Sequence, residues 1–170
     1  MITSWFAKAI YFEPNILLDK LPTYETNIKQ SLDKVGTIRT ELVNVDSTSN
    51  TRKNLFEVVE LDGLREQLYK HAIAFAKEIG YKEDITFNNV WTEIGKKGDY
   101  AFPRNFPRSV VSGVFYVKSS MDDSIKFFEG SNYQAIKCVP GSIVLFPSEV
   151  MYGMTSQLAE ESISISFTLG

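Results

Sequence analysis

Residues 162–168 read Ser-Ile-Ser-Ile-Ser-Phe-Thr, a strict alternation of hydroxyl-bearing and apolar side chains. A period of two is typical of a β-strand with one polar and one apolar face. Short strand-like segments bounded by turn residues precede it, at residues 85–94, 110–118, 124–128, 133–137 and 142–146. Short strands at this spacing favour a sandwich or jelly roll over a parallel sheet.

Residues 1–80 carry helical signals that the second half lacks. Apolar stripes with helical spacing predict one helix over residues 24–35, with Thr23 as its N-cap, and another over residues 64–79, with Asp62 as its N-cap. Both helices are expected to pack outside one sheet. Two further strands and one polar loop are expected, at residues 5–12, 37–45 and 46–53 respectively.

The sequence therefore predicts a mainly β, α+β fold. Its 170 residues fit one domain, 1–170, with a support region over 1–80 and a jelly-roll core over 86–170. A net charge of −3 argues against a nucleic-acid partner. We also expect no membrane partner, because no apolar run approaches the ~18 residues needed to cross a bilayer. The N-terminus does not resemble a signal peptide, so cytoplasmic synthesis is expected.

Titratable and metal-binding side chains are few. The chain has one histidine, His71, which excludes metal sites built on two histidines, and one cysteine, Cys138, which excludes an internal disulfide. His71 is expected beside the apolar stripe of the second helix, at the edge of its buried face, with one hydrogen bond, and Cys138 as a small buried hydrophobe. The carboxylates Asp99, Asp122 and Asp123 do not fit a calcium-loop spacing and are expected in solvated turns.

Three segments of the second half together carry a family resemblance. They are Val90–Ile94 followed by Gly98-Asp99, then Pro107–Val117, and then Pro140–Ser148 with its Leu-Phe-Pro-Ser ending. From about residue 88 onward their order and spacing resemble the 2-oxoglutarate/Fe(II)-dependent oxygenases, a hydroxylase-like family of marine bacteria and tailed phages. The resemblance implies a double-stranded β-helix, which is a jelly roll.

The resemblance also places the family's functional positions in this chain. The three iron-binding histidines correspond to Arg104, Phe106 and Tyr152, and the cosubstrate positions to Ser162 and Glu93. Fe(II) in such a site needs three protein ligands, and phenylalanine and protonated arginine offer no lone pair. The resemblance with these substitutions predicts a degenerate site with no bound metal, no cofactor and no catalytic residue.

Three interpretations of Arg104 remain open. It lies in solvent on a loop, or its guanidinium takes the place of the metal charge and pairs with Glu93 or Glu149, or it holds an anionic ligand. The sequence does not distinguish an open pocket from one that Arg104 fills.

The expected function is that of a catalytically inactive oxygenase-like scaffold with a structural or protein-interaction role. Its partners would be other protein subunits, in a homo-oligomer or as a phage virion or assembly component. One alternative is a divergent 2-oxoglutarate/Fe(II)-dependent hydroxylase. Another is a module that binds a small anion or a peptide in the former iron pocket.

Overall fold

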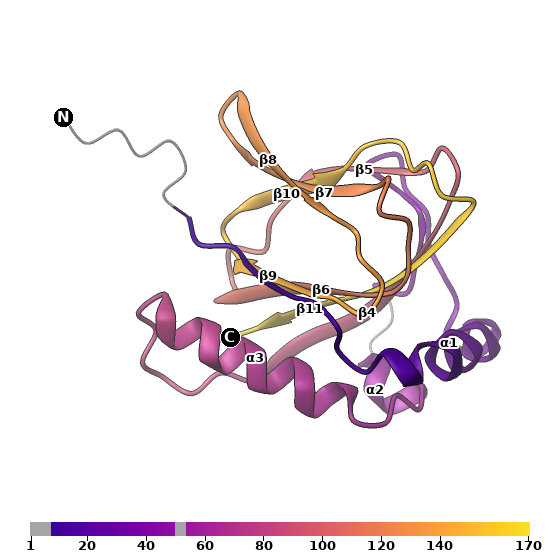
Figure 1. The fold of residues 1–170 in the computed structure, drawn as a ribbon, viewed down its shortest axis with the longest axis horizontal. Helices are drawn as coiled ribbons and strands as arrows, with labels where there is room; N and C mark the ends of the chain where they lie inside the picture. The colour runs from indigo at the N-terminus through magenta and orange to yellow at the C-terminus, as the bar shows by residue number, and fades with distance from the viewer. Residues whose placement is uncertain (1–7, 50–53) are drawn as a thin grey trace.

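The computed structural model describes residues 8–49 and 54–170 of the chain. Two antiparallel sheets face one another, and the helices lie together on the outer side of one of them (Figure 1). The jelly-roll fold class expected from the strand pattern is confirmed. The expected strand at residues 5–12 and the expected loop at 46–53 fall partly outside the described residues.

The larger sheet has six strands in the order β1-β9-β6-β11-β4-β3. These strands are β1 (Tyr11–Glu13), β9 (Ile143–Pro147), β6 (Val111–Lys118), β11 (Glu161–Leu169), β4 (Phe87–Lys96) and β3 (Asp46–Ser47). The second sheet has five strands in the order β2-β5-β10-β7-β8. These are β2 (Val43–Asn44), β5 (Tyr100–Arg104), β10 (Met151–Met154), β7 (Ser124–Glu129) and β8 (Asn132–Lys137).

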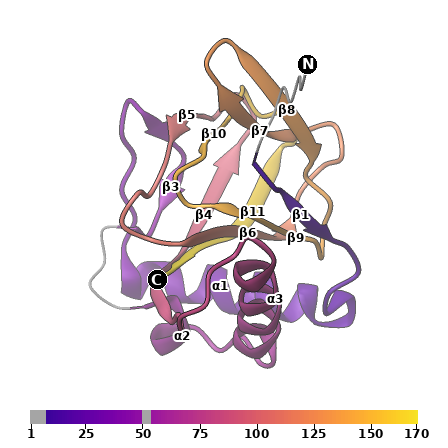
Figure 2. The same ribbon diagram turned by 90° about the vertical axis from the view of Figure 1, so that its left-hand side faces the viewer.

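The helices cover the outer face of the six-stranded sheet, as Figure 2 shows from the side. They are the 3-10 turn η1 (Leu18–Lys20) and the helices α1 (Leu21–Val35), α2 (Leu55–Val58) and α3 (Leu64–Glu78). Ile163, Ile165 and Phe167 of β11 join one apolar core with the buried residues of these helices. The expectation that both long helices pack outside one sheet is therefore confirmed. Among the described residues, no helix has the length and apolar character that a membrane span requires.

The alternation along β11 decides what lies between the sheets. Because successive side chains of a strand point to opposite faces, the serines of β11 face inward where its isoleucines face the helices. β11 pairs with β4 on one side and β6 on the other, with Ser164 opposite both Glu93 and Tyr116. The same alternation places Glu93 and Tyr116 on the inner face. The centre of the larger sheet thus presents polar groups to the second sheet.

Four local expectations about the first half are corrected. The first helix begins at Leu21 rather than after Thr23, because Pro22 occupies its first turn, where a missing N–H costs little. The second long helix has Gly63 at its N-cap instead of Asp62. Residues 37–45 form only β2 and one isolated bridge, and residues 46–47 are strand β3 instead of loop.

Besides β3, the strands that the sequence did not predict are β5 and β10. Both are short and interrupted by residues that weaken a strand, Pro103 in β5 and Gly153 in β10. They pair with each other, and β10 also pairs with β7. Gly153 permits this pairing, because a Cβ there would lie 2.7 Å from the Ala101 carbonyl oxygen. The carriers of Arg104 and Tyr152 are therefore strands where the sequence indicated loops.

Candidate functional site between the sheets

A pocket of about 50 Å³ lies between the two sheets. The inner faces of six strands supply most of its wall. The charged and hydroxyl-bearing residues of that wall are Glu93, Arg104, Tyr116, Ser119, Asp123, Tyr152, Ser162, Ser164 and Ser166.

Arg104 and Tyr152 are direct neighbours across the β5–β10 pair. The guanidinium carbon of Arg104 lies 5.3 Å from the centre of the Tyr152 ring, close enough for a cation–π contact. Tyr152 is 5% exposed. The structure therefore brings together two residues that lie far apart in sequence and that sequence reasoning singled out.

Arg104 forms an ion pair with Glu93 of β4. Its Nη2 donates to Glu93 Oε1 at 2.5 Å, and Trp91 Nε1 donates to the same oxygen at 3.0 Å. Burial alone would lower the pKa of Arg104, but the Glu93 carboxylate and Tyr152 more than offset this, so its pKa lies above the ordinary value. The interpretation of Arg104 as a solvated loop residue is wrong. Its partner is Glu93, whereas Glu149 pairs with Lys8.

Tyr152 lines this end of the pocket, whereas Phe106 packs against Tyr152 and is not among the residues that line the pocket. The Phe106 ring lies 5.4 Å from that of Trp91 and 6.3 Å from that of Tyr152, between ring centres. Burial raises the pKa of Tyr152 to about 12, with Glu93 raising it further and Arg104 opposing. Tyr152 is therefore a neutral phenol at physiological pH. It can donate a hydrogen bond, which the Phe106 side chain cannot do.

Two buried donors at the pocket wall have no partner among the described residues. They are Arg104 Nε and Ser166 Oγ. The Ser166 side chain is 1% exposed, and both residues line the pocket. Buried polar groups are nearly always hydrogen-bonded, so an acceptor atom of a water or a ligand in the pocket would satisfy these two donors.

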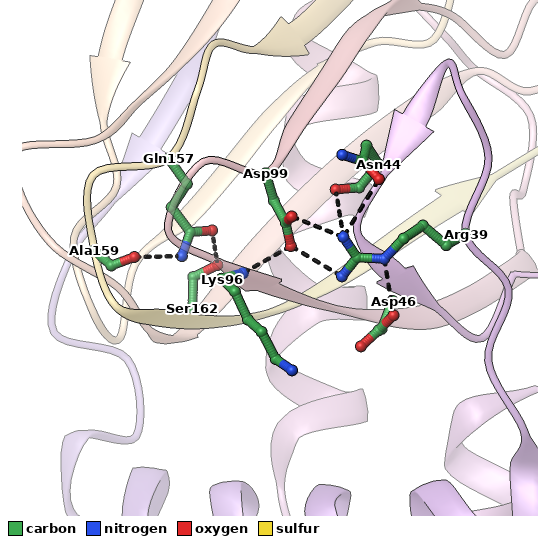
Figure 3. Close-up of polar contacts among 8 residues, drawn as sticks. All are labelled: Arg39, Asn44, Asp46, Lys96, Asp99, Gln157, Ala159 and Ser162. Carbon is green, nitrogen blue, oxygen red and sulfur yellow. Dashed lines mark hydrogen bonds and ion pairs between the residues drawn. The ribbon is translucent and has the colours of Figure 1, made fainter.

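Ser162 lies at the other end of the row of β11 serines that lines the pocket, and its hydroxyl already has a hydrogen-bond partner. Its hydroxyl donates to Gln157 Oε1 at 2.6 Å, and Gln157 Nε2 donates to the Ala159 carbonyl at 2.8 Å (Figure 3). Gly95 makes room for this pair, because a Cβ there would lie 2.1 Å from Gln157 Oε1. Gln157 supports the site through Ser162 and was missed by sequence reasoning, since no motif or spacing marks a lone glutamine.

An ion pair fixes the loop that carries Gln157. Arg39 Nη1 donates to Asp99 Oδ1 at 2.7 Å (Figure 3). The Gln157 backbone N–H donates to the Asp99 carbonyl, also at 2.7 Å. Asp99 and Asp123 are 7% and 6% exposed, so the expectation of solvated turn residues is wrong for both. Buried carboxylates in these turns are retained because backbone and guanidinium donors satisfy them.

Asp123 fixes the neighbouring part of the same loop. Its Oδ1 accepts from the Leu158 N–H at 2.8 Å and its Oδ2 from the Ala159 N–H at 3.2 Å. Asp123 also lines the pocket. It is therefore both a loop anchor and a second negative charge on the pocket wall.

The single histidine and the single cysteine have separate positions. His71 lies on α3, on the helical side of the larger sheet, with its Nδ1 2.9 Å from the Tyr11 hydroxyl. Cys138 lines the pocket but is 2% exposed, and burial raises the pKa of its thiol to about 11. A protonated buried thiol is a poor nucleophile. The expectations of a boundary histidine and a small buried hydrophobe agree with these positions.

Comparison with known proteins identifies the fold. Neither a family model nor a curated protein matches the sequence. Among solved structures, a Pseudomonas putida prolyl-4-hydroxylase matches at 13% identity with a TM-score of 0.71, covering 96% of this chain and 92% of the hydroxylase. A 2OG-Fe(II) oxygenase family oxidoreductase from Burkholderia pseudomallei matches at 10% identity and a TM-score of 0.67, covering 95% and 85% of the two chains.

A third solved structure is the viral collagen prolyl hydroxylase of Paramecium Bursaria Chlorella virus-1, in complex with 2-oxoglutarate. It matches at 14% identity with a TM-score of 0.62, covering 94% of this chain and 95% of the hydroxylase. The fold of this chain is therefore that of the 2-oxoglutarate/Fe(II) oxygenases over nearly its whole length.

These comparisons correct the expected function. The chain shares its fold with hydroxylases and an oxygenase-family oxidoreductase. The expectation of an inactive scaffold that acts as a structural or virion component is contradicted by this finding. The comparisons favour instead the alternative of a divergent 2-oxoglutarate-dependent hydroxylase.

The pocket residues do not fit ferrous iron. Arg104 is cationic, Tyr152 is a neutral phenol, and Glu93 is engaged by Arg104 and Trp91. Among residues 8–49 and 54–170, no three histidine, cysteine or acidic side chains gather where they could hold a metal ion. Three protein ligands are the usual requirement for such an iron site, so no reaction step through iron follows from this geometry.

Proposed function

We propose that this chain is a divergent member of the 2-oxoglutarate oxygenase superfamily that binds a small organic acid in the pocket between its sheets. The acid's carboxylate accepts hydrogen bonds from Arg104, and Tyr152 and Ser166 lie beside it as further donors. The observation that carries the proposal is Arg104, which lines the pocket and has a buried, unpartnered Nε.

The chemistry of arginine supports this assignment. A guanidinium has five N–H donors arranged to bind carboxylates, and Glu93 engages Arg104 through Nη2, which leaves Nε for a ligand. The fold supports it as well, since the viral collagen prolyl hydroxylase with this fold was solved with 2-oxoglutarate. In this proposal Arg104 both forms the ion pair with Glu93 and holds an anionic ligand, which were two separate interpretations in the sequence analysis.

Calorimetric titration tests the proposal. Purified protein is titrated anaerobically with 2-oxopentanoate and with 2-oxoglutarate, with and without Fe(II). We expect saturable binding of at least one acid without added metal, weakened at least about tenfold in Arg104→Lys, which keeps the charge but lacks Nε and the planar fork. Absence of binding by both acids would overturn the proposal.

Hydroxylation dependent on 2-oxoglutarate is the second candidate function. The observation that favours it is the fold match to two prolyl hydroxylases over more than nine-tenths of this chain. Its test is the conversion of 2-oxoglutarate to succinate. Iron-dependent succinate formation would support it and would show that the iron ligands lie outside the pocket residues described above.

A further inference from the structure

The pocket has different chemistry at its two ends. One end holds Arg104, Glu93 and Tyr152. Along β10 the inner face continues from Tyr152 to Met154, and along β11 from Ser164 to Ser162. Two residues along a strand advance the chain by about 6.6 Å. The second end therefore lies about one short carbon chain away from the guanidinium.

The second end carries no positive charge. Ser162 lines it and is engaged in a neutral hydrogen bond with Gln157, and the apolar side chains of Ile125 and Met154 also line the pocket. Ile125 and Met154 are direct partners in the β7–β10 pair, which places them at the same level of the pocket. Among the described residues that line the pocket, Arg104 is the one cation.

Asp123 makes this end unfavourable for an anion. It immediately precedes β7, two residues before Ile125, and its side chain is buried at the pocket wall. Both of its oxygens accept from backbone N–H groups of the Gln157 loop, so its position is fixed. A buried charge without an opposite partner is costly, and a like charge nearby adds to that cost.

We propose that the pocket selects short acids with a single carboxylate and an uncharged tail, and discriminates against dicarboxylates. This inference rests on the proposed function and narrows its ligand class. The carboxylate binds at Arg104, with Ser166 beside it. The tail extends toward Met154 and Ile125, where a second carboxylate would face Asp123 and the neutral Ser162–Gln157 pair. Selectivity of this kind arises from a repulsive element as well as an attractive one.

The test compares two acids with the same five-carbon chain, 2-oxopentanoate and 2-oxoglutarate, which differ only in the terminal methyl or carboxylate. We expect wild-type protein to bind 2-oxopentanoate at least about tenfold more tightly. Equal or tighter binding of 2-oxoglutarate would overturn the selectivity and leave the proposed acid site standing. Failure of both acids to bind would overturn both.

Two aspartate variants test whether Asp123 causes the selectivity against dicarboxylates. Asp123→Asn removes the buried charge. It should reduce the difference in binding affinity between 2-oxopentanoate and 2-oxoglutarate. Asp122→Asn, the matched control, changes an exposed neighbour in the same loop and should leave the difference unchanged. If the Asp123→Asn protein is folded, as shown by cooperative melting, and the affinity difference between the two acids is unchanged, the assigned role of Asp123 is contradicted. The wild-type comparison remains decisive if that variant does not fold.

Discussion

At the scale of single residues, the pairing of Arg104 with Glu93 governs the site. Their side chains are only 20% and 13% exposed, so little water solvates either charge. Each charge is compensated by the other. The bond from Trp91 fixes the carboxylate from a second direction. Single-residue chemistry explains why a cation stands where the resemblance places a metal ligand. It does not by itself reveal what occupies the cavity alongside.

The stability of the Arg104–Glu93 pair can be measured by removing the cation. Arg104→Met leaves the Glu93 carboxylate buried without an opposite charge, and we expect the free energy of unfolding to fall by about 3 kcal/mol in urea denaturation. Lys97→Met is the matched control, because Lys97 and Glu160 are 65% and 85% exposed and their pair contributes below ~1 kcal/mol. Similar losses in both variants would show that the Arg104 pair is not effectively buried.

At the scale of elements, β5 and β10 show where sequence information ended. Pro103 and Gly153 are turn-forming residues, and neither strand has enough alternating positions to reveal a period of two. Their extended state depends on pairing with each other and with β7, which is tertiary information. By contrast β11, with its long alternation, was predicted to within one residue. Sequence patterns thus identified the wall of serines but not the strands that carry Arg104 and Tyr152.

Strand β1 and helix α3 meet through a titratable contact. The Tyr11 hydroxyl lies 2.9 Å from His71 Nδ1 and donates to Glu13 Oε2 at 3.0 Å. Burial lowers the pKa of His71 below 6.5, with Glu13 opposing and Lys70 assisting. As pH falls through and below 6.5, the unfolded chain binds a proton on His71 that the folded chain resists. The stability contributed by the neutral imidazole is therefore present above 6.5 and lost below it.

This pH dependence is tested with His71→Gln, which cannot titrate. Free energies of unfolding are measured for both proteins between about pH 5 and pH 7.5. We expect the wild type to lose more stability than the variant as pH decreases. Carboxylates such as Glu25 and Glu161, whose pKa values the neighbouring lysines lower, contribute equally to both proteins. If the free energies of unfolding of the two proteins change in parallel with pH, His71 does not contribute to the pH dependence of stability.

At the scale of the whole molecule, the fold was predictable and the function was not. Alternation and turn spacing indicated a sandwich or jelly roll with external helices, the family resemblance implied the jelly roll, and the structure has that architecture. The changed positions Arg104, Phe106 and Tyr152 suggested an inert scaffold, because a sequence shows which ligands are missing and not what surrounds them. The unpartnered donors at Arg104 and Ser166 became visible only when the two sheets were brought together.

The most direct test of the central claim is a crystal structure of the chain with 2-oxopentanoate. We expect the acid between the two sheets, with a carboxylate oxygen within about 3.2 Å of Arg104 Nε and its alkyl tail toward Met154. The Glu93–Arg104 pair should remain in place. A pocket that holds only water, or an acid bound elsewhere while Arg104 Nε stays unpartnered, would contradict the account.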